Sequence, residues 1–263
     1  MGKVSVNGTK LYYEEKGKGQ ALLFIHGMCG DARVWADQME RLSPHFRCIA
    51  YDRRGHTRSP LGKIELRTVE LHADDAAELI RELKIEPCIL VGSSGGARVG
   101  LDVMRRYPEM LRGAALSEPP VLALDPDGAA NFLSQLKPSI ESAMSSGDKR
   151  AGVDAFFEFT CPGLWKQISD DIRDRFRDNA EEMFGDLQMP VYSITKEDLT
   201  KINCPCLIIS GSDSHPLFRN VACILKDSIP GAKLTEIKDS GHVTYFEKPI
   251  EFASAVASFA ETL

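Results

Sequence analysis

Short apolar runs alternate with amphipathic helical stretches along most of the chain, and this alternation limits the possible folds more than any other sequence feature. The runs RCIAY (47–51), CILVG (88–92) and CLIIS (206–210) have the length of single strands and few polar residues. Such runs are typical of a parallel sheet that helices cover on both faces. The sequence therefore predicts an α/β fold with a mostly parallel sheet.

The remaining expected elements complete this pattern. Asn7-Gly8 lies between the expected strands at 4–6 and 11–15 and is a strong signal for a hairpin, so the chain should begin with two antiparallel strands. Further strands are expected at 21–25, 112–117 and 233–237, and helices at about 33–42, 68–84, 95–107, 217–228 and 250–261.

The alternation stops after Pro119-Pro120. Residues 121–196 have helical patterns without a clear strand and contain many aromatic side chains. We expect a core formed by residues 1–120 and 197–263 and a helical cap formed by residues 121–196, which we call the cap segment.

Charge and composition exclude several classes of protein. The formal net charge of -6 comes with interspersed signs, so no basic stripe is present to neutralise phosphates, and no nucleic-acid partner is expected. No apolar run has the length of a signal peptide or a membrane span, which predicts a cytoplasmic protein without membrane contact. The seven cysteines are scattered and odd in number, so reduced, mostly buried thiols are expected. Cys204 and Cys206 have no second Cys or His pair beside them, and no metal site is expected.

One strand-to-helix turn carries a candidate nucleophile. Gly92-Ser93-Ser94-Gly95-Gly96 follows an expected strand and opens an expected helix, as the G-x-S-x-G nucleophile elbow requires. The sharp turn lifts the hydroxyl of Ser94 above the sheet edge, and the flanking glycines give the turn its room. The amide of Gly95, at the helix N-terminus, can stabilise a developing oxyanion.

Two further loops supply the other candidate groups. The loop after residues 21–25 begins His26-Gly27-Met28, and its backbone should give the second oxyanion donor, with Met28 the first choice and Gly27 the next. We interpret His26 as structural. His242 follows the last expected strand, where the base of this triad order belongs. The other histidines, His56 and His72 among them, are expected in loops or at the surface.

The chain resembles the α/β-hydrolase superfamily in five motifs and in their order. They are HGMCG (26–30), YDRRGHTRS (51–59), GSSGG (92–96), GSDS (211–214) and SGH (240–242). The resemblance covers the whole chain outside the cap segment. It implies an eight-stranded sheet, a helical cap over the active site and no cofactor. It also implies that Asp52 and Arg53 are structural.

The chain departs from the family pattern at the triad acid. The usual position, three residues after Gly211, holds Ser214, and Asp213 comes one position early. Glu118 ends another strand at the carboxyl edge of the sheet, where reactive crevices of such sheets lie. Zearalenone hydrolase-like members, which this chain resembles, carry their acid after this strand. We therefore prefer Glu118 and keep Asp213 as the alternative.

The predicted activity is that of a serine hydrolase that cleaves a carboxylic ester or lactone of a small apolar substrate through an acyl-enzyme. C–C bond hydrolysis and cofactor-free perhydrolysis use the same triad and stay open, as does a non-catalytic ligand-binding protein. The sequence is compatible with a monomer or a homodimer.

Overall fold

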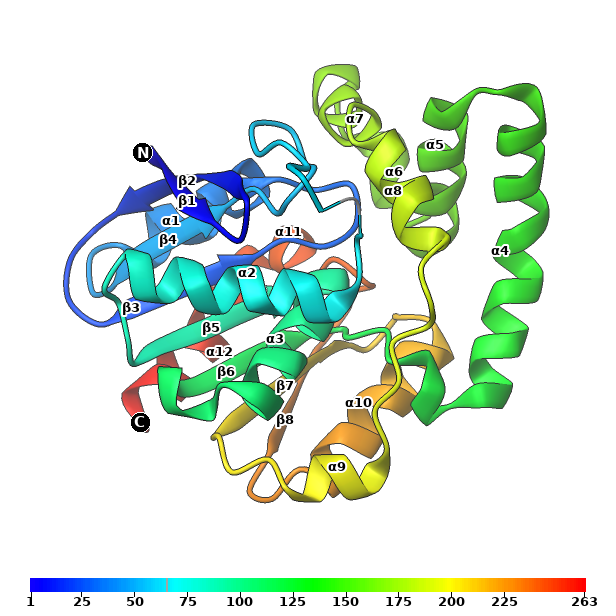
Figure 1. Ribbon diagram of the computed structural model, residues 1–263. Helices are drawn as coiled ribbons and strands as arrows, with labels where there is room; N and C mark the ends of the chain where they lie inside the picture. The colour runs from blue at the N-terminus through cyan, green and yellow to red at the C-terminus, as the bar shows by residue number, and fades with distance from the viewer. Residues whose placement is uncertain (65) are drawn as a thin grey trace.

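The computed structural model describes residues 1–64 and 66–263, which form one eight-stranded sheet with helices on both faces (Figure 1). The strands are β1 (Gly2–Val6), β2 (Thr9–Lys16), β3 (Ala21–Ile25), β4 (Arg47–Tyr51), β5 (Cys88–Ser93), β6 (Leu111–Ser117), β7 (Cys206–Gly211) and β8 (Lys233–Ile237). Their order across the sheet is β1-β2-β4-β3-β5-β6-β7-β8. β1 pairs antiparallel with β2, β2 pairs antiparallel with β4, and every later pair is parallel.

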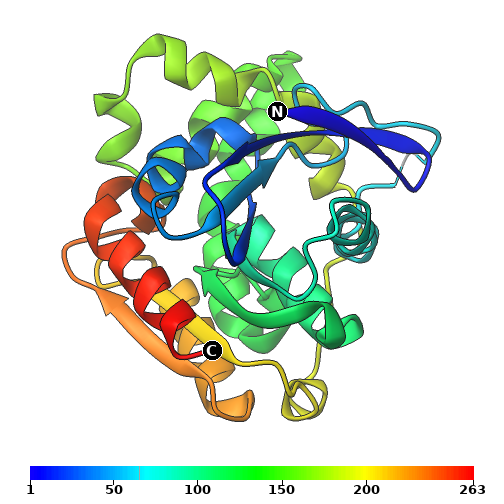
Figure 2. The same cartoon turned by 90° about the vertical axis from the view of Figure 1, so that its left-hand side faces the viewer.

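The central strands send alternate side chains into two separate cores. Leu22 and Phe24 of β3 pack in the core beneath α1 (Ala36–Leu42) and α12 (Pro249–Glu261). Leu23 and Ile25 pack in the core beneath α2 (Val69–Glu82) and α3 (Gly95–Arg106). Figure 2 shows α1 and α12, in blue and red, on the side of the sheet opposite α2. Because both faces are covered, these strands are apolar at consecutive positions.

The remaining helices lie in the connections. They are η1 (Ala32–Trp35), η2 (Pro108–Met110), η3 (Leu122–Leu124), α4 (Pro126–Ser146), α5 (Lys149–Thr160), α6 (Leu164–Gln167), α7 (Asp170–Arg177), α8 (Ala180–Leu187), α9 (Lys196–Thr200), α10 (Pro216–Ser228) and α11 (Thr244–Glu247). None of the helices in the described parts of the chain is long and apolar enough to cross a membrane.

The cap segment leaves the sheet after β6 and returns before β7, and its helices α4 to α8 stand together at one side of the sheet (Figure 1). Aromatic side chains fill its interior: Phe157 stacks on Trp165 with ring centroids 4.6 Å apart, and Phe176 packs edge-on against both rings. Most of the aromatic residues noted in this stretch therefore pack inside the segment.

The predicted α/β class and mostly parallel eight-stranded sheet are confirmed, and each expected strand is present with bounds within two residues of the prediction. The helix expected at 33–42 is divided into η1 and α1, since the backbone changes from a 3-10 turn to an α-helix at Trp35.

Candidate active site

The register of the sheet brings two candidate residues to adjacent strand ends. Ser93 of β5 pairs with Ser117 of β6, and Ser117 pairs with Ile209 of β7. The ladder continues one residue further, because Ser94 N donates to Ser117 O at 2.8 Å and Glu118 N donates to Ile209 O at 3.0 Å. Ser94 and Glu118 therefore leave neighbouring strands at the carboxyl edge of the sheet.

The turn from β5 to α3 is as tight as the sequence predicts. Ser94 has φ 51° and ψ -121°, a strained conformation for a residue with a side chain. A Cβ on Gly92 would lie 2.6 Å from the carbonyl oxygen of Gly96, and one on Gly96 would overlap the carbonyl oxygen of Ile25. The glycines let α3 pack directly against β3 and β5, so Ser94 stands at the turn and is partly exposed.

His242 reaches Ser94 from the loop after β8. Its Nε2 lies 3.0 Å from Ser94 Oγ, within hydrogen-bond distance. The ring is buried and stacks on Phe218 of α10, with centroids 4.1 Å apart and planes at 27°. This packing fixes the plane of the imidazole.

The carboxylate of Glu118 is buried and surrounded by donors. Oε1 accepts hydrogen bonds from Ser210 Oγ and Gly211 N, each at 2.8 Å. Oε2 accepts a hydrogen bond from Ser214 Oγ and lies 3.3 Å from His242 Nδ1. A buried charge requires such partners. The structure thus brings Ser94, His242 and Glu118 into one chain of contacts.

Asp213, the alternative acid, lies apart from this chain of contacts. Its side chain is exposed, and in the described residues the one hydrogen bond to its carboxylate comes from Ser212 Oγ at 2.9 Å. Ser214 occupies the position where the family usually has its acid, and here its hydroxyl donates to Glu118.

The predicted oxyanion residues lie beside the nucleophile. A Cβ on Gly27 would lie 3.1 Å from Ser94 Cβ and 3.7 Å from Ser94 Oγ, so the loop after β3 touches the nucleophile. The Met28 amide nitrogen is 3.5 Å from the position that a Cβ would take on Gly95. Gly27, Met28 and Gly95 are thus gathered around Ser94.

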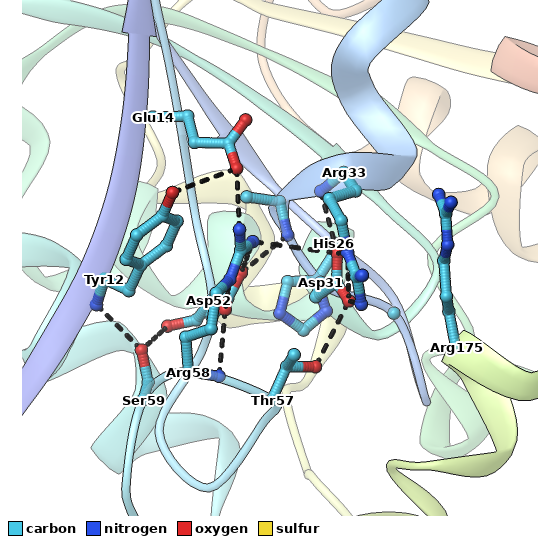
Figure 3. Close-up of polar contacts among 12 residues, drawn as sticks. Tyr12, Glu14, His26, Asp31, Arg33, Asp52, Thr57, Arg58, Ser59 and Arg175 are labelled. Atoms are coloured by element: carbon cyan, nitrogen blue, oxygen red, sulfur yellow. Dashed lines mark hydrogen bonds and ion pairs between the residues drawn. The ribbon is translucent and has the colours of Figure 1, made fainter. Parts of the chain in front are cut away.

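A polar network supports this loop from behind. His26 Nε2 accepts a hydrogen bond from Arg53 N at 2.9 Å. Burial lowers the pKa of His26 to about 3, which keeps the ring neutral and able to accept. Nearby, Arg58 binds Asp52 with Nε 2.7 Å from Oδ2, as Figure 3 shows. These contacts give His26, Asp52 and Arg53 a function in holding the loop.

The expectation that His72 lies in a loop or at the surface is wrong, and His56 lies in a loop as expected but is buried. Both are buried, with 0% and 2% exposure, and the His56 ring packs 4.9 Å from His26 and 6.4 Å from His72. The polar residues around them suggested a surface, yet those residues form buried pairs such as Arg54 with Asp75. Burial lowers the pKa of both histidines well below the ordinary value, so both are neutral.

A cavity of about 370 Å³ opens between α7 of the cap segment and the core. Apolar side chains such as Ile172, Phe176 and Tyr245 line most of it, and Arg33 and Arg175 lie at the same cavity (Figure 3). A narrower cavity adjoins it through shared residues and reaches Val243, next to His242. Ser94 and His242 line neither cavity.

Comparison with known proteins assigns the family. The model of the Alpha/beta hydrolase family matches residues 22–255, so this chain belongs to that family.

Two curated relatives match about half of the chain or less. An uncharacterized hydrolase, YraK, of Bacillus subtilis is 38% identical over 124 residues, 47% of this chain and 46% of its own length. The 2-(acetamidomethylene)succinate hydrolase of Mesorhizobium japonicum is 38% identical over 110 residues, 42% of this chain and 39% of its own length. The aligned region therefore spans less than half the length of either relative.

Solved structures of the same fold cover the whole chain. A thermophilic esterase from Thermogutta terrifontis superposes with a TM-score of 0.79 at 22% identity, covering 100% of this chain and 99% of its own. A meta-cleavage product hydrolase from Pseudomonas fluorescens IP01 gives a TM-score of 0.80 at 22% identity, covering 100% and 98%. At this identity the likeness shows the fold alone.

Proposed function

We propose that this enzyme is a serine hydrolase that cleaves a carboxylic ester or lactone with Ser94, His242 and Glu118 as its triad. The observation that carries the proposal is the unbroken series of contacts from Ser94 Oγ through both ring nitrogens of His242 to the Glu118 carboxylate, at 3.0 and 3.3 Å. A carboxylate at Nδ1 orients the ring and leaves Nε2 free to accept the serine proton. Asp213 makes no contact of this kind.

The reaction begins when Ser94 Oγ attacks the carbonyl carbon and His242 Nε2 takes the hydroxyl proton. The carbonyl oxygen becomes an oxyanion, which accepts hydrogen bonds from the amides of Gly95 and Met28, with Gly27 as the next candidate. The imidazolium then gives its proton to the leaving oxygen. Water attacks the acyl-enzyme by the reverse proton path, and the acid is released.

A small substrate with a large apolar part fits this site. The 370 Å³ cavity lies within the range for small-molecule pockets, and its aromatic and aliphatic lining suits an apolar group. It extends from Cys29, next to Met28, to the cap helix α7. We propose that the cap segment covers the substrate there.

Two further expectations belong to the proposal. Six of the seven cysteines are free and buried, which supports a reducing compartment such as the cytoplasm. A monomer or a homodimer remains the expected assembly.

The proposal is tested by hydrolysis of p-nitrophenyl esters of increasing acyl length, with Ser94→Ala in parallel. We expect turnover by the wild type and a loss of about a millionfold in kcat in Ser94→Ala, because the nucleophile is gone. A fluorophosphonate should label the wild type at Ser94. If no ester is hydrolysed and Ser94 is not labelled, the proposed function is wrong and a ligand-binding role is favoured.

A further inference from the structure

A small polar cavity adjoins Gly95, the residue after Ser94. Its volume is about 30 Å³. One buried water needs about 10–15 Å³, so the cavity has room for about two waters or one carboxylate group. Its polar lining comes from four parts of the chain and includes Arg53, His72, Arg98, Asp186 and Tyr192.

The charges around this cavity are poorly paired. In the described residues Arg98 Nε has no hydrogen-bond partner, and no carboxylate lies within 4.0 Å of its guanidinium nitrogens. Arg53 is 3% exposed and donates from Nη2 to Gly27 O at 3.2 Å. Among the same described residues its Nε lacks a partner, and its closest carboxylate, that of Asp186, is 3.8 Å away. Asp186 Oδ1 is unpaired too. Two guanidinium groups therefore face one weakly engaged carboxylate.

Burial makes this arrangement unfavourable without a ligand. It lowers the pKa of Arg98 and raises that of Asp186, because removal from water disfavours both charged forms. His72 contributes two more ring nitrogens without partners and no positive charge. Buried charge in excess is normally compensated by an ion or a ligand.

The excess charge lies next to the proposed oxyanion donors. Arg98 follows Ser94 by one helical turn, and its amide donates to Ser94 O at 3.2 Å. Arg98 Nη2 is 3.8 Å, and Met28 N is 3.5 Å, from the position that a Cβ would take on Gly95. An anion bound by Arg98 would therefore lie close to the carbonyl that Ser94 attacks.

We propose that Arg98, assisted by Arg53, binds a carboxylate of the substrate, so that the preferred substrates are monoesters of short dicarboxylic acids or lactones that carry a carboxylate. This inference rests on the proposed serine hydrolase function and narrows its substrate class. Guanidinium binds carboxylate through two parallel hydrogen bonds, and the cavity accepts a group of that size. We expect the rest of the substrate to be apolar.

The test compares each carboxylate ester with a neutral ester of the same shape. Monomethyl succinate is paired with methyl 4-methylpentanoate, and monomethyl adipate with methyl 6-methylheptanoate. We expect kcat/KM to be higher for at least one carboxylate ester than for its neutral partner. Arg98→Met should lower kcat/KM for that carboxylate ester about 100-fold and change kcat/KM for the neutral ester little. Arg112→Met, which removes an exposed arginine, should leave the ratio unchanged.

A second variant guards against loss of folding in Arg98→Met. Asp186→Asn removes the competing carboxylate. It should lower KM for the carboxylate ester several-fold and leave KM for the neutral ester unchanged. Equal rates for both ester types in the wild type, together with an equal effect of Arg98→Met on both, would overturn the inference while the hydrolase function stands.

Binding is measured separately so that the two proposals can fail separately. Calorimetric titration of Ser94→Ala with monomethyl succinate and monomethyl adipate should show saturable binding that Arg98→Met weakens about 100-fold in the same background. Binding with this dependence but no turnover by the wild type would support the carboxylate site and contradict the proposed function. Binding unaffected by Arg98→Met would contradict the carboxylate site.

Discussion

Two charged side chains near Ser94, the fully buried Glu118 and the partly buried Arg98, differ in their partners. Glu118 accepts three hydrogen bonds from Ser210, Gly211 and Ser214 and also contacts His242. Arg98, one turn after Ser94, has no ion pair in the described part of the chain. The protein therefore supplies hydrogen-bond partners to both oxygens of the Glu118 carboxylate but leaves the Arg98 guanidinium without an ion-pair partner.

This difference indicates that Glu118 orients another residue of the protein, whereas Arg98 binds a ligand. A carboxylate whose lone pairs are all engaged by the protein is fixed in place and suits a group that orients another residue. A buried cation without a partner is stabilised when a ligand supplies the opposite charge. We therefore expect changes on the Glu118 side to affect every substrate alike, and changes on the Arg98 side to depend on substrate charge.

The largest effect is expected for Glu118→Gln. The amide keeps the shape of the side chain but cannot support the imidazolium, so kcat should fall about ten-thousandfold for neutral and carboxylate esters alike. Steady-state kinetics with both ester types measures this. Asp213→Asn is the matched control and should keep near-normal kcat, since Asp213 is exposed and makes no contact with His242. A collapse in Asp213→Asn with activity retained in Glu118→Gln would reverse the assignment of the acid.

Gly27→Ala tests the loop after β3, which contacts Ser94. Its Cβ would lie 3.1 Å from both Ser93 O and Ser94 Cβ, so the loop and its oxyanion amides must shift. We expect kcat to fall about 100- to 1,000-fold with KM little changed. Gly163→Ala, where a Cβ meets no atom within 4 Å, is the matched control. Unchanged kcat in Gly27→Ala would argue against this loop as a source of oxyanion donors.

The strands and the strand-to-helix turn at Ser94 could be predicted because their signals are local. Strand length, apolar content and the Gly92 to Gly96 pattern each depend on a few neighbouring residues. The two possible acids, Glu118 and Asp213, could be proposed from strand ends. The choice between them depends on the loop after β7, which turns Asp213 outward and Ser214 inward.

The guanidinium cluster could not be predicted from the sequence. Arg53, Arg98 and Asp186 are far apart in the chain, and their approach depends on how α8 and the segment after it pack against α2 and α3. A single arginine in a helix normally faces solvent, so Arg98 carried no signal of its own. His72 was misjudged for the same reason, because its helix has few large apolar residues and the sequence does not reveal which face is covered.

Ser214→Ala removes one of the three hydrogen-bond donors to the Glu118 carboxylate. Glu118 Oε2 is buried and would lose its hydroxyl partner, which should lower the free energy of unfolding by about 2 kcal/mol. Chemical denaturation measures this loss. Ser212→Ala is the control, since that hydroxyl donates to the exposed Asp213 and should cost about 0.5 kcal/mol or less. Equal effects of the two substitutions would show that the Glu118 carboxylate does not depend on Ser214.

The smallest effect concerns the neutral histidines around the arginines. Burial lowers the pKa of His26, His56 and His72 in the folded state, while the unfolded chain keeps values of about 6.5. Below that pH the unfolded state binds more protons, so stability falls as pH falls, by about 1.4 kcal/mol per unit for each histidine. The raised pKa values of Asp75 and Asp186 act in the opposite sense, because the folded state protonates first there.

His72→Leu isolates one of these histidines, because both of its ring nitrogens lack partners among the described side chains and no hydrogen bond is lost. Denaturation of wild type and variant between pH 7 and 5.5 should show that the variant loses about 1.3 kcal/mol less in total over this range. His45→Gln, at an exposed position, should leave the slope unchanged. The same slope in His72→Leu and the wild type would mean that His72 is protonated in the folded state. The positive charge beside Arg98 would then be larger, and carboxylate binding should strengthen as the pH falls.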